Sequence, residues 1–402
     1  GEIMPDTPPR PRVLGYCTNV HAGDTYEQML AGLERHALAV KRILCPRESM
    51  PIGLWLSAQA ARQVLAEDRL AHLRDWLIEH GLEVFTLNGF PFGNFHSEVV
   101  KHRVYEPDWR QPERLRYTRD LIAILAELLP EGGEGSISTL PLGWRGAMAD
   151  DAAMAQAAAP LLDLMHHLAR VELDTGRFIH IDLEPEPGCV LDEARGVIDF
   201  FHKHLFDHVD ALSAQAYLRV CHDICHAAVM FEDQAQVLRA YRQAGIRVGK
   251  VQISSALCVA WDELDEAGHA EALKQLGAMD EPRYLHQTVT RGRDGEHVFH
   301  DDLPAAMAAA ADGAPPRGEW RVHFHVPIFA DRLGLLGTTQ DDIIRCIEAI
   351  EPGDEVHHFE VETYAWGVLP PRWRAADLAE GIAREITWAV ERLGFASKGA
   401  LR

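Results

Sequence analysis

Short apolar runs alternate with longer amphipathic segments along most of this 402-residue chain. Eight runs read as strands, beginning at Val13, Ile52, Leu82, Ser136, Phe178, Leu218, Gly249 and Val356. Most intervening segments have helical periodicity and end near glycine, as in AARQVLAEDRLAHLRDWLIEHG. Strands joined by helical crossovers predict a parallel sheet. Their number alone leaves a closed (β/α)₈ barrel and an open sheet nearly balanced.

Polar residues on one face of two strands favour the barrel. In FIHIDLE, His180, Asp182 and Glu184 alternate with apolar residues, and in VHHFEVETY, Glu360 and Glu362 do the same. A strand inside a buried parallel sheet is expected to be apolar on both faces. Charged residues near the carboxyl end of a strand instead indicate the mouth of a barrel, where active sites are built. A half-exposed edge strand is the alternative.

The chain is expected to form one domain over residues 13–395, with a disordered, proline-rich leader over 1–12 and a tail over 396–402. Residues 255–355 are too long for one crossover, and they contain several strand-like and helical pieces. Long structureless loops are rare inside compact domains. We therefore expect an elaborated insertion between strands 7 and 8, serving as a lid or an interface.

Charge and composition restrict the partners. The 39 Lys and Arg residues face 61 Asp and Glu residues, a formal net charge of -22, which disfavours nucleic acid and anionic membranes. No apolar run is long enough to insert into a membrane. The seven cysteines do not form a disulfide pattern. The polar first twelve residues contain no apolar signal core, so we expect a cytoplasmic protein. We also expect a small-molecule substrate and leave open whether the chain forms a homo-oligomer.

Four short motifs carry groups that can bind a metal or move a proton. They are IDLEPEPG with Glu184, CHDICH with Asp223 and His226, HFH with His323 and His325, and FEVETYAW with Glu362. Taken singly, such pairs are most often surface or capping residues. Each, however, lies on the carboxyl side of a predicted strand. Mixed carboxylate and imidazole donors suit Mn, Fe, Zn or Co better than Ca, so the motifs together predict a divalent metal site.

The order of these motifs resembles the sugar isomerase and epimerase superfamily, which has the xylose-isomerase-like barrel and includes endonuclease IV. The segments YCTNVH, NGFPFGNFH, VYEPDWRQPERLRYT, LEPEPG, CHDICHAAVMFED and VETYAWGVLP look like the EboE family of metabolite traffic proteins. These segments are spread over most of the chain. The resemblance implies the barrel fold and a bound divalent metal ion, but it implies no particular reaction.

Residue by residue, the resemblance assigns the superfamily's metal ligands to Glu184, Asp223, His226 and Glu362. Glu184 and Glu362 would also be the acid and base of an epimerase. The superfamily's seventh-strand histidine is replaced here by Gln252, whose carbonyl oxygen is a weaker ligand. This departure puts a standard epimerase site in doubt.

The HFH element resembles the DxH element of endonuclease IV. It implies that His325, alone or together with His323, supplies the imidazole that Gln252 replaces.

Further residues are candidates for substrate binding, each with a structural alternative. Asn19 and His21 end the first strand, while His96 and Phe92 lie in the third-strand loop, where aromatic rings stack on a polyol or pack a lid. The remaining candidates are Arg145 and Lys250 as anion-binding cations, Glu186 as a group that orients a ligand or caps a turn, His323, and Trp366 as a platform or core residue.

Three functions fit these residues. The first is an isomerase or epimerase of a sugar, cyclitol or related hydroxy-carbonyl compound, with a metal ion that stabilises an enediolate. The second is a metal-dependent hydrolase or phosphodiesterase of the endonuclease IV type, favoured by HFH and disfavoured by the acidic surface. The third is a non-catalytic metabolite-binding barrel, which the replacement by Gln252 supports.

Overall fold

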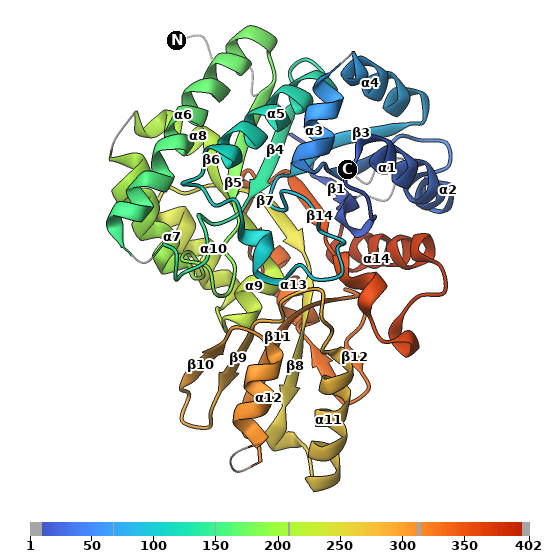
Figure 1. Cartoon of the computed structure of the whole chain (residues 1–402), viewed down its shortest axis with the longest axis vertical. Helices are drawn as coiled ribbons and strands as arrows, with labels where there is room; N and C mark the ends of the chain where they lie inside the picture. The colour runs from blue at the N-terminus through green and yellow to red at the C-terminus, as the bar shows by residue number, and fades with distance from the viewer. Residues whose placement is uncertain (1–9, 67, 149, 208–209, 312–314, 396–402) are drawn as a thin grey trace.

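The computed structural model describes residues 10–66, 68–148, 150–207, 210–311 and 315–395, and shows a parallel barrel with a second sheet attached (Figure 1). The barrel contains eight strands in the order β1-β14-β7-β6-β5-β4-β3-β2. They are β1 (Val13–Tyr16), β2 (Met50–Trp55), β3 (Leu82–Asn88), β4 (Glu134–Thr139), β5 (Phe178–Leu183), β6 (Leu218–Asp223), β7 (Val248–Ile253) and β14 (His358–Val361). All eight predicted strands are present.

The sheet closes on itself through its first strand. On one side β1 pairs in parallel with β14, with Val13 opposite His358. On the other side a parallel bridge joins Cys17, just after β1, to Gly53 of β2. The predicted (β/α)₈ barrel is therefore confirmed, and the open sheet is excluded.

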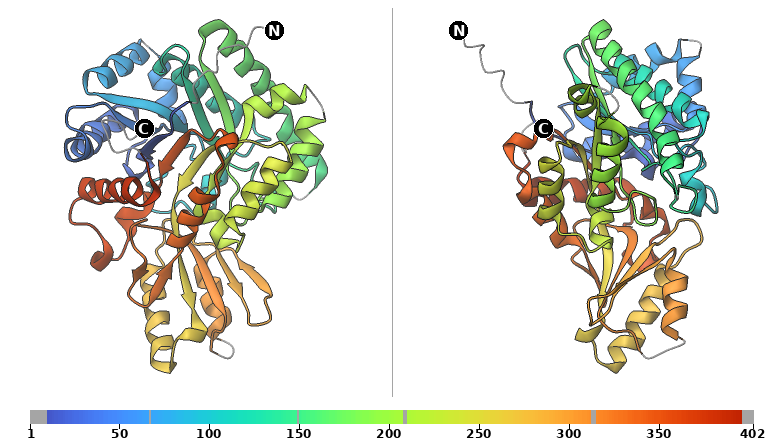
Figure 2. Two further views of the ribbon diagram at one scale, coloured as in Figure 1. Left: turned by 180° about the vertical axis from the view of Figure 1, so that it is seen from behind. Right: turned by 90° about the vertical axis from the view of Figure 1, so that its left-hand side faces the viewer.

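Helices surround the barrel and lie between successive strands, as the two further views in Figure 2 show. No helix in the described part of the chain is both long and apolar enough to cross a membrane. The barrel helices are α1 (Tyr26–Gly32), α2 (Leu38–Leu44), α3 (Ala58–Leu65), α4 (Arg69–Glu79), α5 (Pro112–Leu128), α6 (Asp151–Thr175), α7 (Ala194–Phe200), α8 (Ala211–Tyr217), α9 (Ile224–Val229), α10 (Gln234–Gln243), α13 (Gln340–Ala349) and α14 (Leu378–Leu393).

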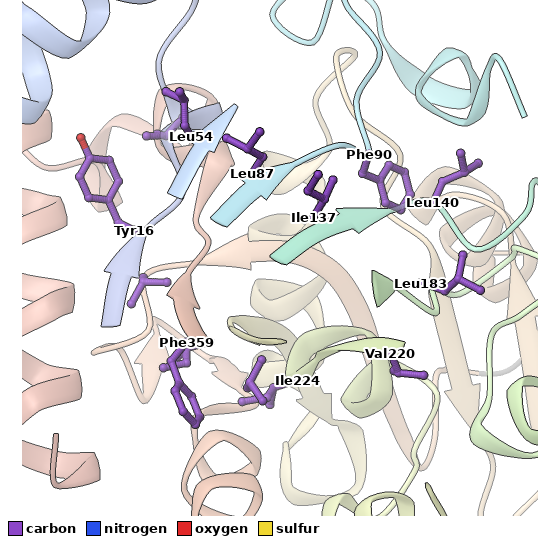
Figure 3. Packing of buried hydrophobic residues seen from close by; sticks show 14 of the residues in the cluster. Tyr16, Leu54, Leu87, Phe90, Ile137, Leu140, Leu183, Val220, Ile224 and Phe359 are labelled. Carbon is purple, nitrogen blue, oxygen red and sulfur yellow. The ribbon is translucent and has the colours of Figure 1, made fainter. Parts of the chain in front are cut away.

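The apolar core lies between the strands and these helices. Leu54, Leu87, Ile137 and Val220 are fully or almost fully buried, and they point away from the barrel axis around the ring of strands (Figure 3). Since side chains alternate along a strand, their sequence neighbours face the barrel interior. This apolar outer face holds the helices against the barrel.

The interior of the barrel is unusually polar. Lys250 of β7 is completely buried, and its ammonium group lies 3.0 Å from Oε1 of Glu360 on β14. It also donates to the hydroxyls of Thr86 and Ser138, each at 3.0 Å. These contacts offset the cost of burying two charges. The polar alternation predicted for the barrel mouth thus continues deep into the barrel.

The insertion forms a six-stranded sheet in the order β10-β9-β11-β8-β13-β12, with antiparallel pairing throughout. Its strands are β8 (Ser255–Ala260), β9 (Thr288–Arg291), β10 (His297–His300), β11 (Glu319–Val326), β12 (Arg332–Leu333) and β13 (Leu336–Thr338), and its helices are α11 (Glu266–Met279) and α12 (Leu303–Ala311). The sheet begins two residues after β7 ends and projects beyond the barrel (Figure 1). The insertion between the last two barrel strands is therefore confirmed.

The structure describes only part of the two terminal segments that the sequence predicts. Residues 10–12 form no helix or strand, whereas residues 1–9 and the predicted tail over 396–402 lie outside the described residues. Within the predicted insertion, α13 packs beside α10 as an ordinary barrel helix that leads the chain into β14. The part that departs from the barrel pattern therefore ends before α13.

Candidate active site

A cavity of about 50 Å³ lies where several barrel strands end. From the barrel it is lined by residues at or just after strand ends, including Asn19, Asn88, Glu184, His226 and Glu362. From the insertion it is lined by Tyr284, Leu285, Gln287 and His323, and from other loops by Phe90, Pro91, Phe95, Val100, Lys101, Val104, Tyr105, Glu186 and Tyr364. The barrel and the insertion therefore build this cavity together.

Three histidine side chains converge beside the cavity, each with its Nδ1 atom against an acceptor. Nδ1 of His226 lies 2.7 Å from the carbonyl oxygen of Pro185, and Nδ1 of His325 lies 2.8 Å from that of Glu362. Nδ1 of His323 lies 2.7 Å from Oε1 of Gln287. Because these acceptors require a proton on Nδ1, the Nε2 atom of each ring carries a lone pair whenever the ring is neutral.

The Nε2 atoms of His323 and His325 face each other at 3.1 Å. Burial lowers the pKa of His325 to about 4, and burial together with neighbouring imidazoles lowers the pKa of His323 well below its ordinary value. Two neutral rings that already donate through Nδ1 have no proton to share at this contact. A cation between or beside them would satisfy both lone pairs.

Two carboxylates complete this cluster. Nε2 of His226 lies 3.3 Å from Oε1 of Glu186 and 3.5 Å from Oδ2 of Asp223. Oδ1 of Asp223 accepts from the hydroxyl of Ser254 at 2.6 Å, but its Oδ2 is buried without a hydrogen-bond donor. Burial would raise the pKa of Asp223, but His226 and His325 outweigh it and hold the pKa below its ordinary value.

The donor atoms fit a transition-metal ion. One group contains Asp223, His226 and His325, and another contains Glu186, His226 and His323. Within each group the donor atoms lie within 4.8 Å of one another. Imidazole nitrogens with one or two carboxylate oxygens suit Zn, Fe, Mn or Co. The orphaned Oδ2 of Asp223 and the facing imidazoles are therefore consistent with a metal centre.

Two further groups of possible metal ligands lie close by. Cys225 forms one with His323 and His325, and Cys17 forms another with Glu360 and Glu362. The second lies beside the ammonium group of Lys250, which already neutralises Glu360. We therefore consider the imidazole cluster the better metal site.

Glu184 and Glu362 also line the cavity. The thiol of Cys221 donates to Oε1 of Glu184 at 3.3 Å. Burial, and then the nearby Glu362 and Asp223, raise the pKa of Glu184 well above its ordinary value. Burial, followed by Asp223 and Glu360, does the same for the pKa of Glu362. Both carboxyl groups therefore hold a proton more readily than an exposed glutamate does.

Gln252 turns its amide nitrogen toward carboxylates. Its Nε2 donates to Oε1 of Glu360 at 2.8 Å and to Oε2 of Glu362 at 2.9 Å. Its Oε1 is buried without a hydrogen-bond donor. Gln252 therefore bridges two acidic residues of β14 and the adjoining segment, and this role is separate from the metal ligation suggested by the sequence.

Among the predicted substrate-binding residues, Asn19, Glu186 and His323 line the cavity. His96 is not among the lining residues, but its Nε2 lies 2.6 Å from the carbonyl oxygen of Asn19. His21 contacts the hydroxyl of Tyr16 at 3.1 Å and lines a different, smaller cavity.

Four other candidates are engaged elsewhere in the described structure. The Phe92 ring packs 5.3 Å from that of Tyr117, and Trp366 is buried and donates to Glu385 at 2.8 Å. Arg145 is 3.3 Å from Asp192, and Lys250 is buried against Glu360. None of these four side chains is among those that line the cavity.

Several cavity residues had no signal as site residues in the sequence. Tyr105, Tyr284, Gln287 and Tyr364 line it, but their side-chain types recur throughout the chain. Gln287 is well placed, since its amide joins His323 on one side to Tyr105 on the other at 2.8 Å. Only the fold of the insertion brings it there.

No family model matches the sequence, and the comparison with curated proteins finds no match. Among solved structures, the probable 3-DHS dehydratase AsbF from Bacillus anthracis, involved in petrobactin synthesis, is 12% identical with a TM-score of 0.46, covering 95% of this chain and 99% of that chain. The IolI protein with a binding zinc atom is 11% identical with a TM-score of 0.45, covering 95% and 98%. A xylose isomerase domain protein from Alicyclobacillus acidocaldarius is 13% identical with a TM-score of 0.43, covering 95% and 98%. At these identities the likeness concerns the fold alone, and the EboE resemblance stays a prediction.

Proposed function

We propose that this protein is a metal-dependent isomerase or epimerase of a sugar, cyclitol or related hydroxy-carbonyl metabolite. One observation supports it above the others. Two buried carboxyl groups, Glu184 and Glu362, line the same cavity as imidazole side chains whose Nε2 atoms are free to bind a metal. Such a pair can remove and return a proton on a carbon beside a carbonyl, and a metal ion would supply the electrophile.

Asp223, His226 and His325 would hold the ion, with Glu186 and His323 adjacent. A bound divalent ion would polarise the substrate's oxygens and thereby acidify the neighbouring C–H bond. The backbone carbonyls of Pro185 and Glu362 fix the ring orientations of His226 and His325 by accepting from Nδ1. Such fixed orientation strengthens imidazole as a ligand.

The proton would move between the substrate carbon and the two glutamates. The amide nitrogens of Asn19, Asn88 and Gln252 lie 3.5, 3.4 and 2.9 Å from Oε2 of Glu362, which orients that carboxyl group. The thiol of Cys221 orients the carboxyl group of Glu184 by donating a hydrogen bond to it. With one carboxyl group removing a proton and the other returning one, an epimerase inverts the carbon between them.

The test is solvent deuterium exchange. Purified protein loaded with Zn, Mn, Fe or Co should incorporate deuterium from D₂O into a panel of aldoses, ketoses and inososes beside the carbonyl carbon. Glu184→Gln and Glu362→Gln should abolish this exchange while retaining the metal. Exchange by the metal-loaded protein that is unchanged in both variants would refute the assigned roles.

A hydrolase is the second candidate, because Glu186 and His323 lie beside the Asp223, His226 and His325 group and would be left to hold a second ion once His226 binds the first through its single free nitrogen. Two ions side by side are typical of phosphoester hydrolysis. Metal analysis distinguishes the two functions. One tightly bound ion per chain supports the isomerase, whereas two or three ions with phosphodiesterase activity would replace it by the hydrolase.

A further inference from the structure

The charged residues around the cavity indicate which substrates it can accept. Glu184, Glu186 and Glu362 contribute three carboxyl groups, and Lys101 is the one cation among the lining residues of the described chain. The ammonium group of Lys101 lies 2.6 Å from Oδ2 of Asp302, so its charge is already balanced. A divalent ion held at Asp223 and beside Glu186 would have its charge balanced by these two carboxylates, so a phosphate or carboxylate entering this cavity would meet Glu184 and Glu362 without a further free cation beside it.

Arg145 and Lys250, the two cations that the sequence suggested for anion binding, add no positive charge to the cavity. Arg145 has a side chain that is 45% exposed, donates to the carbonyl oxygen of Gly188 and pairs with Asp192. Lys250 is enclosed in the barrel against Glu360. Neither side chain lines the cavity.

The side-chain amides of the lining offer acceptors rather than donors. The amide nitrogens of Asn19 and Asn88 are used by Glu362. That of Gln287 is used by Tyr105 and by the carbonyl oxygen of Pro187 at 3.0 Å. By contrast, Oδ1 of Asn19 is buried without a donor. An unsatisfied buried acceptor is costly, so a ligand that donates a hydrogen bond there would be favoured.

Aromatic rings form much of the remaining wall. Phe90, Phe95, Tyr105, Tyr284 and Tyr364 all line the cavity. Such rings pack well against the C–H face of a ring-shaped polyol, whose hydroxyl groups then point outward as donors. The wall therefore complements a compact molecule with one apolar face and several hydroxyl groups.

We infer that the substrate is a polyol that carries no phosphate or carboxylate on the part that enters the cavity. Its hydroxyl groups would donate to Asn19 and to the glutamates, and its C–H face would lie on the aromatic wall. This inference rests on the proposed function, which it narrows to uncharged substrates. It also separates this cavity from sites built to bind phosphorylated sugars.

The experiment compares matched pairs of probes on metal-loaded protein by calorimetry. The pairs are myo-inositol with its 1-phosphate and D-xylulose with its 5-phosphate, at millimolar concentrations. The uncharged member should bind at least roughly tenfold more tightly, since one unbalanced charge pair in such a site exceeds the free energy of a tenfold ratio. Equal or tighter binding of the phosphorylated member, or no binding of any probe, would overturn the inference.

A variant of the cavity wall tests whether the charge of the cavity sets this preference. Leu285 is buried in the cavity wall, so Leu285→Arg introduces a cation there and should move the preference toward the phosphorylated member. Leu285→Met is the matched control and should keep the wild-type preference. Selective binding of uncharged probes without any deuterium exchange would reject the proposed reaction but leave this inference standing.

Discussion

At the scale of single residues, the imidazole cluster depends on where each proton lies. His226, His323 and His325 each have an oxygen acceptor at Nδ1, so their Nε2 atoms turn toward one another and toward Asp223 and Glu186. Without a cation, this arrangement places lone pairs and carboxylates in contact inside a buried site. Under the proposed function, these side chains would bind the metal ion with little reorientation.

The His323→Ala variant tests whether His323 contributes to metal binding. We expect the affinity for Zn²⁺ or Co²⁺ to fall by roughly a hundredfold, on the scale of changes seen around metal sites, as measured by competition with a chromophoric chelator. His269→Ala is the control, because His269 is buried in the insertion but bonds to the carbonyl oxygen of Trp261. Equal affinity in the two variants would remove His323 from the metal site.

At the scale of elements, one carboxyl group ties together segments that carry the site. Glu385 of α14 is 1% exposed and accepts from the hydroxyl of Thr363 at 2.5 Å, from Trp366, and from the backbone nitrogen of Ile328 at 3.1 Å. Thr363 follows Glu362, whereas Ile328 lies two residues beyond β11. Helix α14 thus holds the closing barrel segment and the returning insertion strand in place.

Burial raises the pKa of Glu385 to about 7. In the unfolded chain this carboxyl group loses its proton near pH 4.5, so between about pH 4.5 and 7 the folded state binds more protons. The stability contribution is full below this window and is lost as pH rises through it, by about 3 kcal/mol in total. The side chain of the Glu385→Gln variant cannot titrate. As the pH rises from about 4.5 to above 7, the free energy of unfolding of the wild type should therefore fall by that amount relative to this variant.

Urea denaturation at pH 4.5 and pH 8 measures the difference. Glu391→Gln, an exposed change on the same helix, is the control and should follow the wild type at both values. A Glu385→Gln variant whose stability relative to the wild type is the same at both pH values would show that Glu385 does not titrate in this window.

The elements also show what a sequence can and cannot reveal here. Asp223 and His226 were predictable because Asp223 ends β6 and His226 lies three residues further on, and the carboxyl ends of barrel strands meet at one rim. His325 was predictable only from its motif. Gln287 and Tyr284 were not, because they depend on how β9 and β11 pair within the insertion. Arg145 and Lys250 were suggested by charge alone, and the partners that engage them are distant in sequence.

At the scale of the whole molecule, the barrel and the insertion meet across the cavity. The backbone nitrogens of Val100 and Lys101 donate to the carbonyl oxygen of Arg283 at 2.7 and 2.9 Å. The hydroxyl of Tyr284 donates to the carbonyl oxygen of Phe95 at 2.9 Å. These hydrogen bonds hold the two segments together beside the cavity.

The Lys101–Asp302 ion pair joins the same two segments. Lys101→Met should weaken this closure by about 1 kcal/mol, the usual contribution of a partly exposed ion pair. A chelator such as EDTA should then remove the metal ion about fivefold faster, as followed by stopped-flow absorbance of Co²⁺. Lys274→Met, on the exposed face of α11, is the control. Unchanged removal rates in both variants would show that the pair does not govern access.

The return of β11 to the barrel mouth also sets the order of events during biosynthesis. Asp223 and His226 leave the ribosome about a hundred residues before His323 and His325, and β14 follows later still. Neither half of the ligand set suffices alone, and the barrel closes only when β14 pairs with β1. We therefore expect the metal ion to be acquired late in maturation, as the step that joins a nearly finished barrel to its insertion.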